Sequence, residues 1–131
     1  MMQAEWPVRV YYEDTDAGGV VYHASYLCYL ERARTEWLRA LGYSQAKLRQ
    51  EESLVFTVVA MTLDFLKPAR LDDQLSIRSQ ARLAGGASVE FTQEILRGSE
   101  RILAATVRVA CLDAGSFRPR RLPAPIKGSL E

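Results

Sequence analysis

Asp16 and His23 are the residues of this chain whose types and spacing favour chemistry. They lie in the stretch from Glu13 to His23, which also contains two adjacent glycines and the only histidine. A carboxylate and an imidazole can move protons or attack a carbonyl carbon, and glycines let the backbone approach a ligand closely. Because a long helical pattern follows, unpaired N–H groups at the helix start would stabilise an oxygen anion. This stretch is the predicted site.

Simpler interpretations of the same residues stay open. Aspartates in Asp/Gly-rich loops commonly cap turns, and a lone histidine commonly caps or packs. A calcium loop counted from Asp14 would place Gly18 at its fifth position and Ser25 at its twelfth, where Asp or Asn and then Glu are needed. His23 has no second histidine with which to hold a transition metal. We therefore expect no metal site.

Ser25 and Cys28 lie close to His23 in sequence, but they do not form the pattern of a nucleophile and its base. Neither lies in a Gly-x-Ser-x-Gly elbow, and residues two apart at a helix start do not face one another. Ser25 is interpreted as a helix cap or first-turn residue. Cys28 and Cys111 are interpreted as reduced core residues, since no Cys-x-x-Cys spacing is present.

The composition predicts one globular domain over residues 1–131. With 131 residues, of which 48% are apolar, the chain can bury a sizeable core. Seventeen Lys and Arg balance sixteen Asp and Glu, so no overall field favours nucleic acid or an anionic membrane. The first ten residues do not form the apolar stretch of a signal peptide, and no segment is apolar enough to span a membrane. These features, without a disulfide framework, favour the cytoplasm.

One long helix is predicted over residues 25–41. Its apolar residues recur at spacings of three and four, and Gly42 stands where a helix C-cap belongs. Before it, alternation at Val8, Val10 and Tyr12 predicts a strand. Residues 44–53 are interpreted as a polar linker, and the proline-containing tail over 113–131 is expected to be irregular.

Four further strands are predicted over residues 54–66, 75–83, 89–96 and 102–112, with glycine turns at 85–86 and 98–99. Consecutive hairpins imply an antiparallel sheet, so the fold class is α+β, with about five strands around one helix. A lone helix covers one face of such a sheet. A second copy of the chain is therefore expected on an open edge or on the other face.

Two motifs resemble a known family. The first runs from Tyr12 to Tyr26 as YEDTDAGGVVYHASY and continues over residues 29–36 as YLERARTE; the second, over 63–73, reads LDFLKPARLDD. Both are similar to the signatures of the YbgC-type acyl-CoA thioesterases, in the 4-hydroxybenzoyl-CoA thioesterase group of hotdog-fold proteins. The likeness covers residues 8–112. It implies a hotdog fold, in which an antiparallel sheet wraps around a long helix, and hydrolysis of an acyl-CoA to a free acid and coenzyme A without a bound cofactor.

The resemblance also implies roles for individual residues. Asp16 occupies the place of the catalytic aspartate, which acts either as nucleophile or as the base for water, and His23 stands where a helix N–H polarises the thioester carbonyl. Glu31 matches a helix position that we interpret as structural or as a support for the residues that touch the substrate. Tyr22, Ser25 and Tyr26 could line the acyl pocket. Candidates for binding the coenzyme A phosphates are Lys67 and Arg70, with Arg118, Arg120 and Arg121 as weaker ones.

The family further implies a homo-oligomer, either a dimer or a dimer of dimers (a homotetramer). Asp16 of one subunit would then meet residues 56–61 or Leu63 of another. A non-catalytic module that binds acyl carrier protein or an envelope partner of the Tol-Pal type is the alternative function. A hotdog hydratase is a further rival, although its His and Asp pattern is absent. The length and type of the acyl group stay open.

Overall fold

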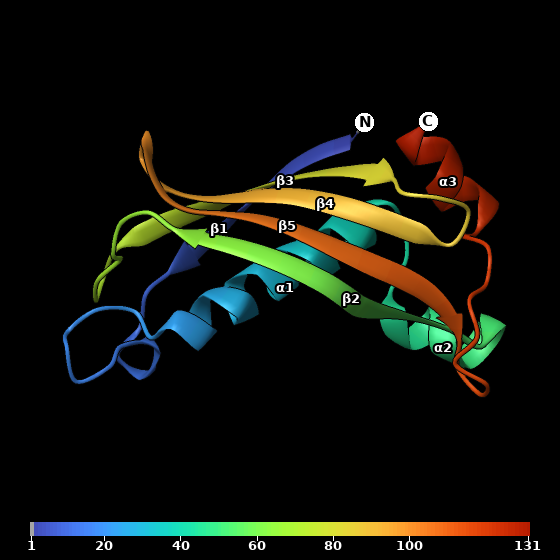
Figure 1. Cartoon of the computed structure of the whole chain (residues 1–131), viewed down its shortest axis with the longest axis horizontal. Helices are drawn as coiled ribbons and strands as arrows, with labels where there is room; N and C mark the ends of the chain where they lie inside the picture. Colours follow the sequence, from blue (N-terminus) through green and yellow to red (C-terminus); the bar gives the residue numbers. More distant parts are fainter. Residues whose placement is uncertain (1) are drawn as a thin grey trace.

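A five-stranded antiparallel sheet curves over one long helix (Figure 1). The computed structural model describes residues 2–131, so Met1, the first residue of the expected domain, lies outside the described residues. The strand order is β1-β3-β4-β5-β2. The strands are β1 (Met2–Arg9), β2 (Leu54–Phe65), β3 (Gln74–Leu83), β4 (Ser88–Arg97) and β5 (Glu100–Asp113). The predicted α+β arrangement is confirmed.

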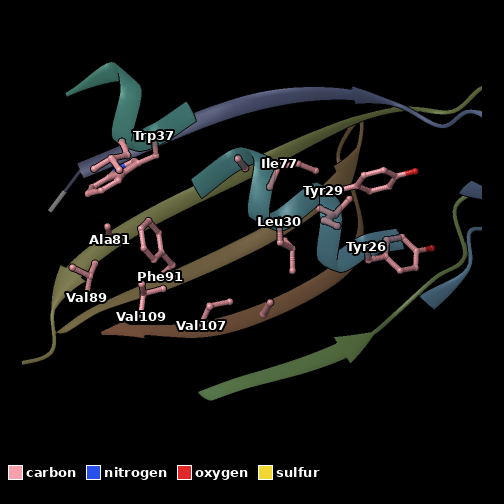
Figure 2. Packing of buried hydrophobic residues seen from close by; sticks show 14 of the residues in the cluster. Tyr26, Tyr29, Leu30, Trp37, Ile77, Ala81, Val89, Phe91, Val107 and Val109 are labelled. Atoms are coloured by element: carbon pink, nitrogen blue, oxygen red, sulfur yellow. The ribbon is translucent and has the colours of Figure 1, made fainter. Parts of the chain in front are cut away.

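The long helix, α1 (His23–Ala40), begins two residues before the predicted start and ends one residue before the predicted end. Its buried side chains pack against the inner face of the sheet (Figure 2). Gly42 has a φ of +91°, which is the left-handed conformation expected just after a helix. The buried residues of α1 are Tyr26, Tyr29, Leu30, Ala33, Trp37 and Leu38.

The central strands bury alternate side chains toward α1. In β4 the alternating buried positions are Val89, Phe91, Gln93 and Ile95, with Leu96 also buried after them, so a glutamine occupies one place in an otherwise apolar row. Phe91 meets Trp37 edge to face, with ring centroids 5.1 Å apart. This packing fixes the orientation of α1 on the sheet.

The two edge strands differ in composition. β1 pairs on one side with β3 and carries Pro7 as well as charged Glu5 and Arg9 on its length. β2 pairs on one side with β5 and contains a bulge, because Val58 opposes Val109 while Ala60 opposes Arg108. Val58 and the bulged Val59 are 45% and 55% exposed. Proline and charges discourage further strand pairing, whereas an exposed apolar edge favours it.

Three expectations about local structure are wrong. The strand around Val8 begins earlier and ends at Arg9, and Tyr12 is 82% exposed in the short 3₁₀ helix η1 (Tyr12–Asp14). The supposed linker over 44–53 contains α2 (Gln45–Glu52), which Ser44 caps by accepting a hydrogen bond from the Lys47 N–H. The tail contains α3 (Ala124–Leu130), whose Ile126 and Leu130 are buried.

Cys28 also differs from its interpretation. Its side chain is exposed on α1, whereas Cys111 is buried in β5, as expected; both are free thiols. Burial raises the pKa of the Cys111 thiol. The difference follows from helical geometry, because Cys28 lies two positions after buried Tyr26 and therefore on another face of α1.

Candidate active site

Asp16 lies in a tight exposed loop that follows β1 and η1. The Asp16 N–H donates to the Val20 carbonyl at 2.9 Å, and the Gly19 N–H donates to the Asp16 carbonyl at 3.0 Å. The Asp16 Oδ1 accepts a hydrogen bond from the Gly18 N–H at 2.8 Å. Within residues 2–131, Oδ2 has no hydrogen-bond partner. The turn therefore fixes one carboxylate oxygen and leaves the other exposed for a ligand.

The N-terminus of α1 is the second part of the site. Tyr22 is the N-cap residue, but its side chain makes no capping hydrogen bond, and the first turn contains no acid. Within the described chain, the backbone N–H groups of His23 and Ala24 have no protein acceptor, whereas the Ser25 N–H donates to the Tyr22 carbonyl. Unpaired N–H groups and the helix dipole make this end a site for an oxygen anion.

The loop and the helix start are tied together. Thr15 and Val21 form an isolated antiparallel bridge, and the Tyr22 N–H donates to the Asp14 carbonyl at 2.8 Å. His23 is exposed and its ring lies 4.4 Å from that of Tyr22. Four of the predicted site residues, Asp16, Tyr22, His23 and Ser25, thus gather at one end of α1.

Tyr26 differs from these four because it is buried. It is 4% exposed, and its hydroxyl accepts a hydrogen bond from the Ala69 N–H at 3.1 Å. Its ring centroid lies 5.9 Å from that of Phe65, at the end of β2. Burial raises the pKa of Tyr26. The hydroxyl therefore holds the segment after β2 in place.

Tyr29 is the other buried tyrosine at this end of α1. Figure 2 shows the hydroxyls of Tyr26 and Tyr29 pointing out of the same end of the core, away from Trp37. The Tyr29 hydroxyl is buried without a hydrogen-bond partner in the described chain. Burial and the neighbouring Asp14 carboxylate raise the pKa of Tyr29. Tyr29 therefore stays protonated at neutral pH.

The cations after β2 have different surroundings. The Lys67 ammonium is paired with Glu100 at 2.9 Å, while the exposed Arg70 side chain has no ion-pair partner in residues 2–131. Arg120 is tied to the Glu52 carbonyl at 2.7 Å and lies near Asp113. The segment that follows β5, which contains Arg118, Arg120 and Arg121, runs past α2, at the end of the sheet opposite the loop that precedes α1 (Figure 1). Of these five candidate cations, Lys67 and Arg70 are the two that flank Ala69, whose backbone contacts Val21 and Tyr26 at the start of α1.

A cavity of about 180 Å³ lies farther along α1, between the helix and the strands β2, β4 and β5. Glu31, Arg34 and Thr35 line one side, and Phe56, Val58 and Phe91 are among the apolar residues that line the rest. Glu31 accepts a hydrogen bond from the Thr35 hydroxyl at 2.8 Å. Glu31 therefore borders this cavity in addition to its structural contact.

A buried polar network supports the cavity. The Gln93 side chain, 0% exposed, accepts from Arg34 Nη1 at 3.0 Å and donates to the Ser79 hydroxyl and the Leu30 carbonyl. Burial lowers the pKa of Arg34, although the guanidinium remains charged at neutral pH. Sequence reasoning missed this network, and the signal that could have found it is the glutamine in the apolar row of β4.

Residues 2–131 contain neither a candidate metal centre nor a candidate membrane-spanning helix. No cluster of three or more His, Cys, Asp or Glu side chains is placed to hold a metal ion. No described helix combines the length and apolar character needed to cross a membrane.

Similarity to known proteins places the chain in a broad class of enzymes. Residues 10–130 match the model of the thioesterase-like superfamily. A crystal structure of a probable thioesterase from Bartonella henselae superposes with a TM-score of 0.88 at 38% identity, covering 93% of this chain and 100% of that one. The hotdog fold of the thioesterases, implied by the sequence motifs, is confirmed.

Curated relatives define the family more narrowly. The acyl-CoA thioesterase YbgC of Haemophilus influenzae is 46% identical over 95% of this chain and 91% of its own length. The acyl-CoA thioester hydrolase YbgC of Escherichia coli O6:H1 is 51% identical over 92% and 90%. The chain belongs to the thioesterase-like superfamily and, within it, to the YbgC family of thioesterases.

Proposed function

We propose that the protein hydrolyses acyl-CoA thioesters to a free acid and coenzyme A, and that the Asp16 carboxylate carries the reaction. The observation that supports this most is the pair of unpaired N–H groups at His23 and Ala24, next to the loop that presents the free Asp16 oxygen. An oxyanion site and one carboxylate are chemically sufficient to hydrolyse a thioester, because the thiolate is a good leaving group. The activities of the YbgC relatives agree with this.

The thioester carbonyl oxygen would accept hydrogen bonds from the N–H groups at the start of α1. The helix dipole stabilises the negative charge that develops on that oxygen. Asp16 either attacks the carbonyl carbon, expelling the coenzyme A thiolate and leaving an acyl-aspartyl anhydride that water cleaves, or takes a proton from the attacking water. Both routes use the oxygen that the turn leaves free. No resident cofactor is needed, since coenzyme A arrives as part of the substrate.

We propose that a second copy completes the site along β2. A two-fold axis between β2 strands pairs them antiparallel, so that the first half of one strand lies beside the second half of the other. Phe56 and Val58 of the second copy then lie near Phe65 and the Asp16 loop. This arrangement places the acyl group in the cavity of the second copy, whose volume suits a small ring or a short chain.

The coenzyme A part of the substrate would lie toward the segment after β2. Arg70 is exposed and its side chain has no ion pair among residues 2–131, so its guanidinium is the better phosphate ligand on this chain. Lys67 is 57% exposed and retains donors beyond its pair with Glu100. Removing either cation is expected to raise KM more than it lowers kcat, because the phosphates lie away from the reacting carbonyl.

The test is release of free thiol from a panel of acyl-CoA substrates by the wild-type protein and by Asp16→Asn. The variant should fold normally and lose activity by about a thousandfold or more, because the amide can neither attack nor accept the proton. Asp72→Asn is the matched control, since Asp72 has an exposed side chain and the φ of +70° there suits asparagine. Near-normal thiol release by Asp16→Asn would contradict the mechanism, and no release by the wild type would point to a binding module.

His23→Ala separates the two contributions of residue 23. The imidazole is removed, but the backbone N–H remains at the helix start. We expect kcat to fall by about tenfold, much less than in Asp16→Asn. A loss as large as that of Asp16→Asn would assign the imidazole itself an essential proton transfer.

A further inference from the structure

Arg97 is the centre of a group of ion pairs between the β4–β5 turn and the segment 68–73 that follows β2. It is the last residue of β4, and its Nη1 donates to the Asp73 carboxylate at 2.6 Å and to the Pro68 carbonyl at 3.2 Å. Its Nε and Nη2 both donate to Glu100 Oε1, at 3.0 and 2.7 Å. One guanidinium therefore joins the β4–β5 turn to both ends of the segment 68–73.

The segment 68–73 has a second set of contacts on its other side. Ala69, which is 0% exposed, donates its N–H to the Tyr26 hydroxyl and accepts the Val21 N–H at its carbonyl at 2.8 Å. The Asp73 carboxylate also accepts the Arg70 N–H at 2.8 Å. The backbone of Ala69 is thus the link between the segment and the start of α1.

Val21 connects Ala69 to both the Asp16 loop and the start of α1. It pairs with Thr15 across the Asp16 loop and precedes the N-cap of α1 by one residue. A shift of Ala69 would therefore move the Asp16 carboxylate relative to the free N–H groups at the helix start. A displacement of about 1 Å between reacting groups can cost roughly a hundredfold in rate.

We propose that Arg97 is a positioning residue for thioester cleavage, because it holds the segment 68–73 that sets Val21, and through it Asp16, against the start of α1. The proposal rests on the proposed function. Arginine suits this position better than lysine, because its planar fork donates four hydrogen bonds to three acceptors, whereas a lysine ammonium has only three N–H donors. Arg97 and Lys67 balance Asp73 and Glu100, so the group is electrically neutral.

The pKa directions agree with tight pairing. Glu100 has a lowered pKa because of the hydrogen bonds from Arg97 and Lys67. Burial acts to raise the pKa of Asp73, but hydrogen bonds from the Arg70 N–H and Arg97 outweigh it, and the net direction is down. Both carboxylates are therefore ionised at neutral pH and available to the guanidinium.

The experiment compares Arg97→Met and Arg97→Lys with Arg82→Met. Arg82 forms an Arg–Glu pair with Glu90 at the opposite end of the β3–β4 pair and has no contact with the segment 68–73, so its loss is the matched control. With an acyl-CoA that the wild type hydrolyses, Arg97→Met should lower kcat by about ten- to a hundredfold with KM within about twofold. Arg97→Lys should be intermediate, and Arg82→Met should match the wild type.

Amide hydrogen exchange supplies a readout that does not depend on turnover. Arg97→Met should speed exchange at Val21 and Ala69 while the β4–β5 amides stay protected. If Arg97→Met does not fold, Tyr26→Phe replaces it, because it releases Ala69 from the other side and should give the same fall in kcat and the same faster exchange. Arg97→Met with unchanged kcat and unchanged exchange at Val21 would overturn the proposal. If the wild type releases no thiol while Val21 exchange still responds to Arg97→Met, the proposed function is overturned. Arg97 then remains a residue that positions the start of α1 for a different ligand.

Discussion

The two ends of α1 differ in how their backbone groups are satisfied. At the C-terminal end, the N–H groups of Leu41 and Tyr43 donate to the Leu38 carbonyl, and that of Gly42 donates to the Arg39 carbonyl. At the N-terminal end, the side chain of the N-cap residue Tyr22 makes no capping hydrogen bond, and two N–H groups lack a protein acceptor in the described chain. A cap of Ser, Asp or Asn commonly adds about 1 kcal/mol. The C-terminal end is built for stability, and the N-terminal end leaves its donors free for a ligand.

The contrast with α2 strengthens this interpretation. The much shorter α2 begins with Ser44, whose hydroxyl accepts the Lys47 N–H at 3.2 Å. The chain therefore uses a side-chain cap where no ligand is proposed. The start of α3, after Pro123, also lacks a side-chain cap, so the start of α1 is distinguished by its unpaired N–H groups lying next to the Asp16 loop rather than by the missing cap alone.

Among the changes that test this contrast between the two ends of α1, the largest effect is expected when the N-terminal end is made to resemble an ordinary capped end. Tyr22→Asp supplies a carboxylate that accepts an N–H of the first turn, and it should raise the free energy of unfolding by about 1 kcal/mol. The same carboxylate occupies and repels the position of the developing oxyanion, so kcat should fall on the order of a hundredfold. Urea denaturation and thiol release measure the two effects.

Tyr22→Asn is the companion variant, because it caps the helix without adding a charge. Its kcat should lie between that of the wild type and that of Tyr22→Asp. A more stable Tyr22→Asp protein with unchanged kcat would show that the N–H groups at this end take no part in the reaction.

A smaller effect, on stability alone, is expected at the C-terminal end. Gly42→Ala forces an alanine into a φ of +91°, which should cost about 1–2 kcal/mol although its Cβ would meet no atom within 4 Å. The melting temperature should fall by about 4 °C per kcal/mol, with kcat unchanged at 25 °C. Gly86→Ala is the control, since its Cβ also meets open space and its φ is not positive. Equal melting temperatures for the two variants would contradict the role given to Gly42.

The smallest expected effect is on the change of the unfolding free energy with pH. Because Asp73 and Glu100 have lower pKa values in the folded chain, the unfolded chain binds more protons, and falling pH favours unfolding. The stabilisation that these two carboxylates give the folded chain is complete above the ordinary carboxyl pKa of about 4. It is lost as the pH falls through their lowered pKa values in the folded chain. The difference in unfolding free energy between wild type and Arg97→Met should therefore narrow from pH 7 to pH 3. A constant difference across that range would mean that the carboxylates do not stabilise the N-terminal end through Arg97.

Local patterns were sufficient for the elements that bury an apolar stripe. The three- and four-residue spacing of Tyr26, Leu30, Ala33 and Trp37 predicted α1, because all four pack on the sheet. The helix α2 was missed because Leu48 is its only buried residue, which gives no stripe. The helix α3 was missed because prolines suggested irregular chain, although proline fits the first turn of a helix.

The candidate site was predictable where it is continuous in sequence. Asp16, Tyr22 and His23 belong to one motif, so their proximity followed from the chain itself. The contacts of Ala69 with Val21 and Tyr26, and those of Arg97 with Pro68 and Asp73, join residues that are far apart in sequence. An alanine and a surface-type arginine carry no pattern that would reveal such roles.

The bulge at Val59 changes which residues of β2 face the helix, from even-numbered ones before it to odd-numbered ones after it. Before Val59, the inward-facing residues have even numbers, such as Phe56 and Val58 at the cavity; after it, Met61 and Leu63 pack on the core. If Val59 were instead paired as an ordinary strand residue, Thr62 and Asp64 would turn inward and Met61 and Leu63 outward; with the bulge, Val58 and Met61 both lie opposite buried valines of β5. The bulge thus absorbs one extra residue, so that both halves of β2 keep apolar side chains on the helix-facing side of the sheet.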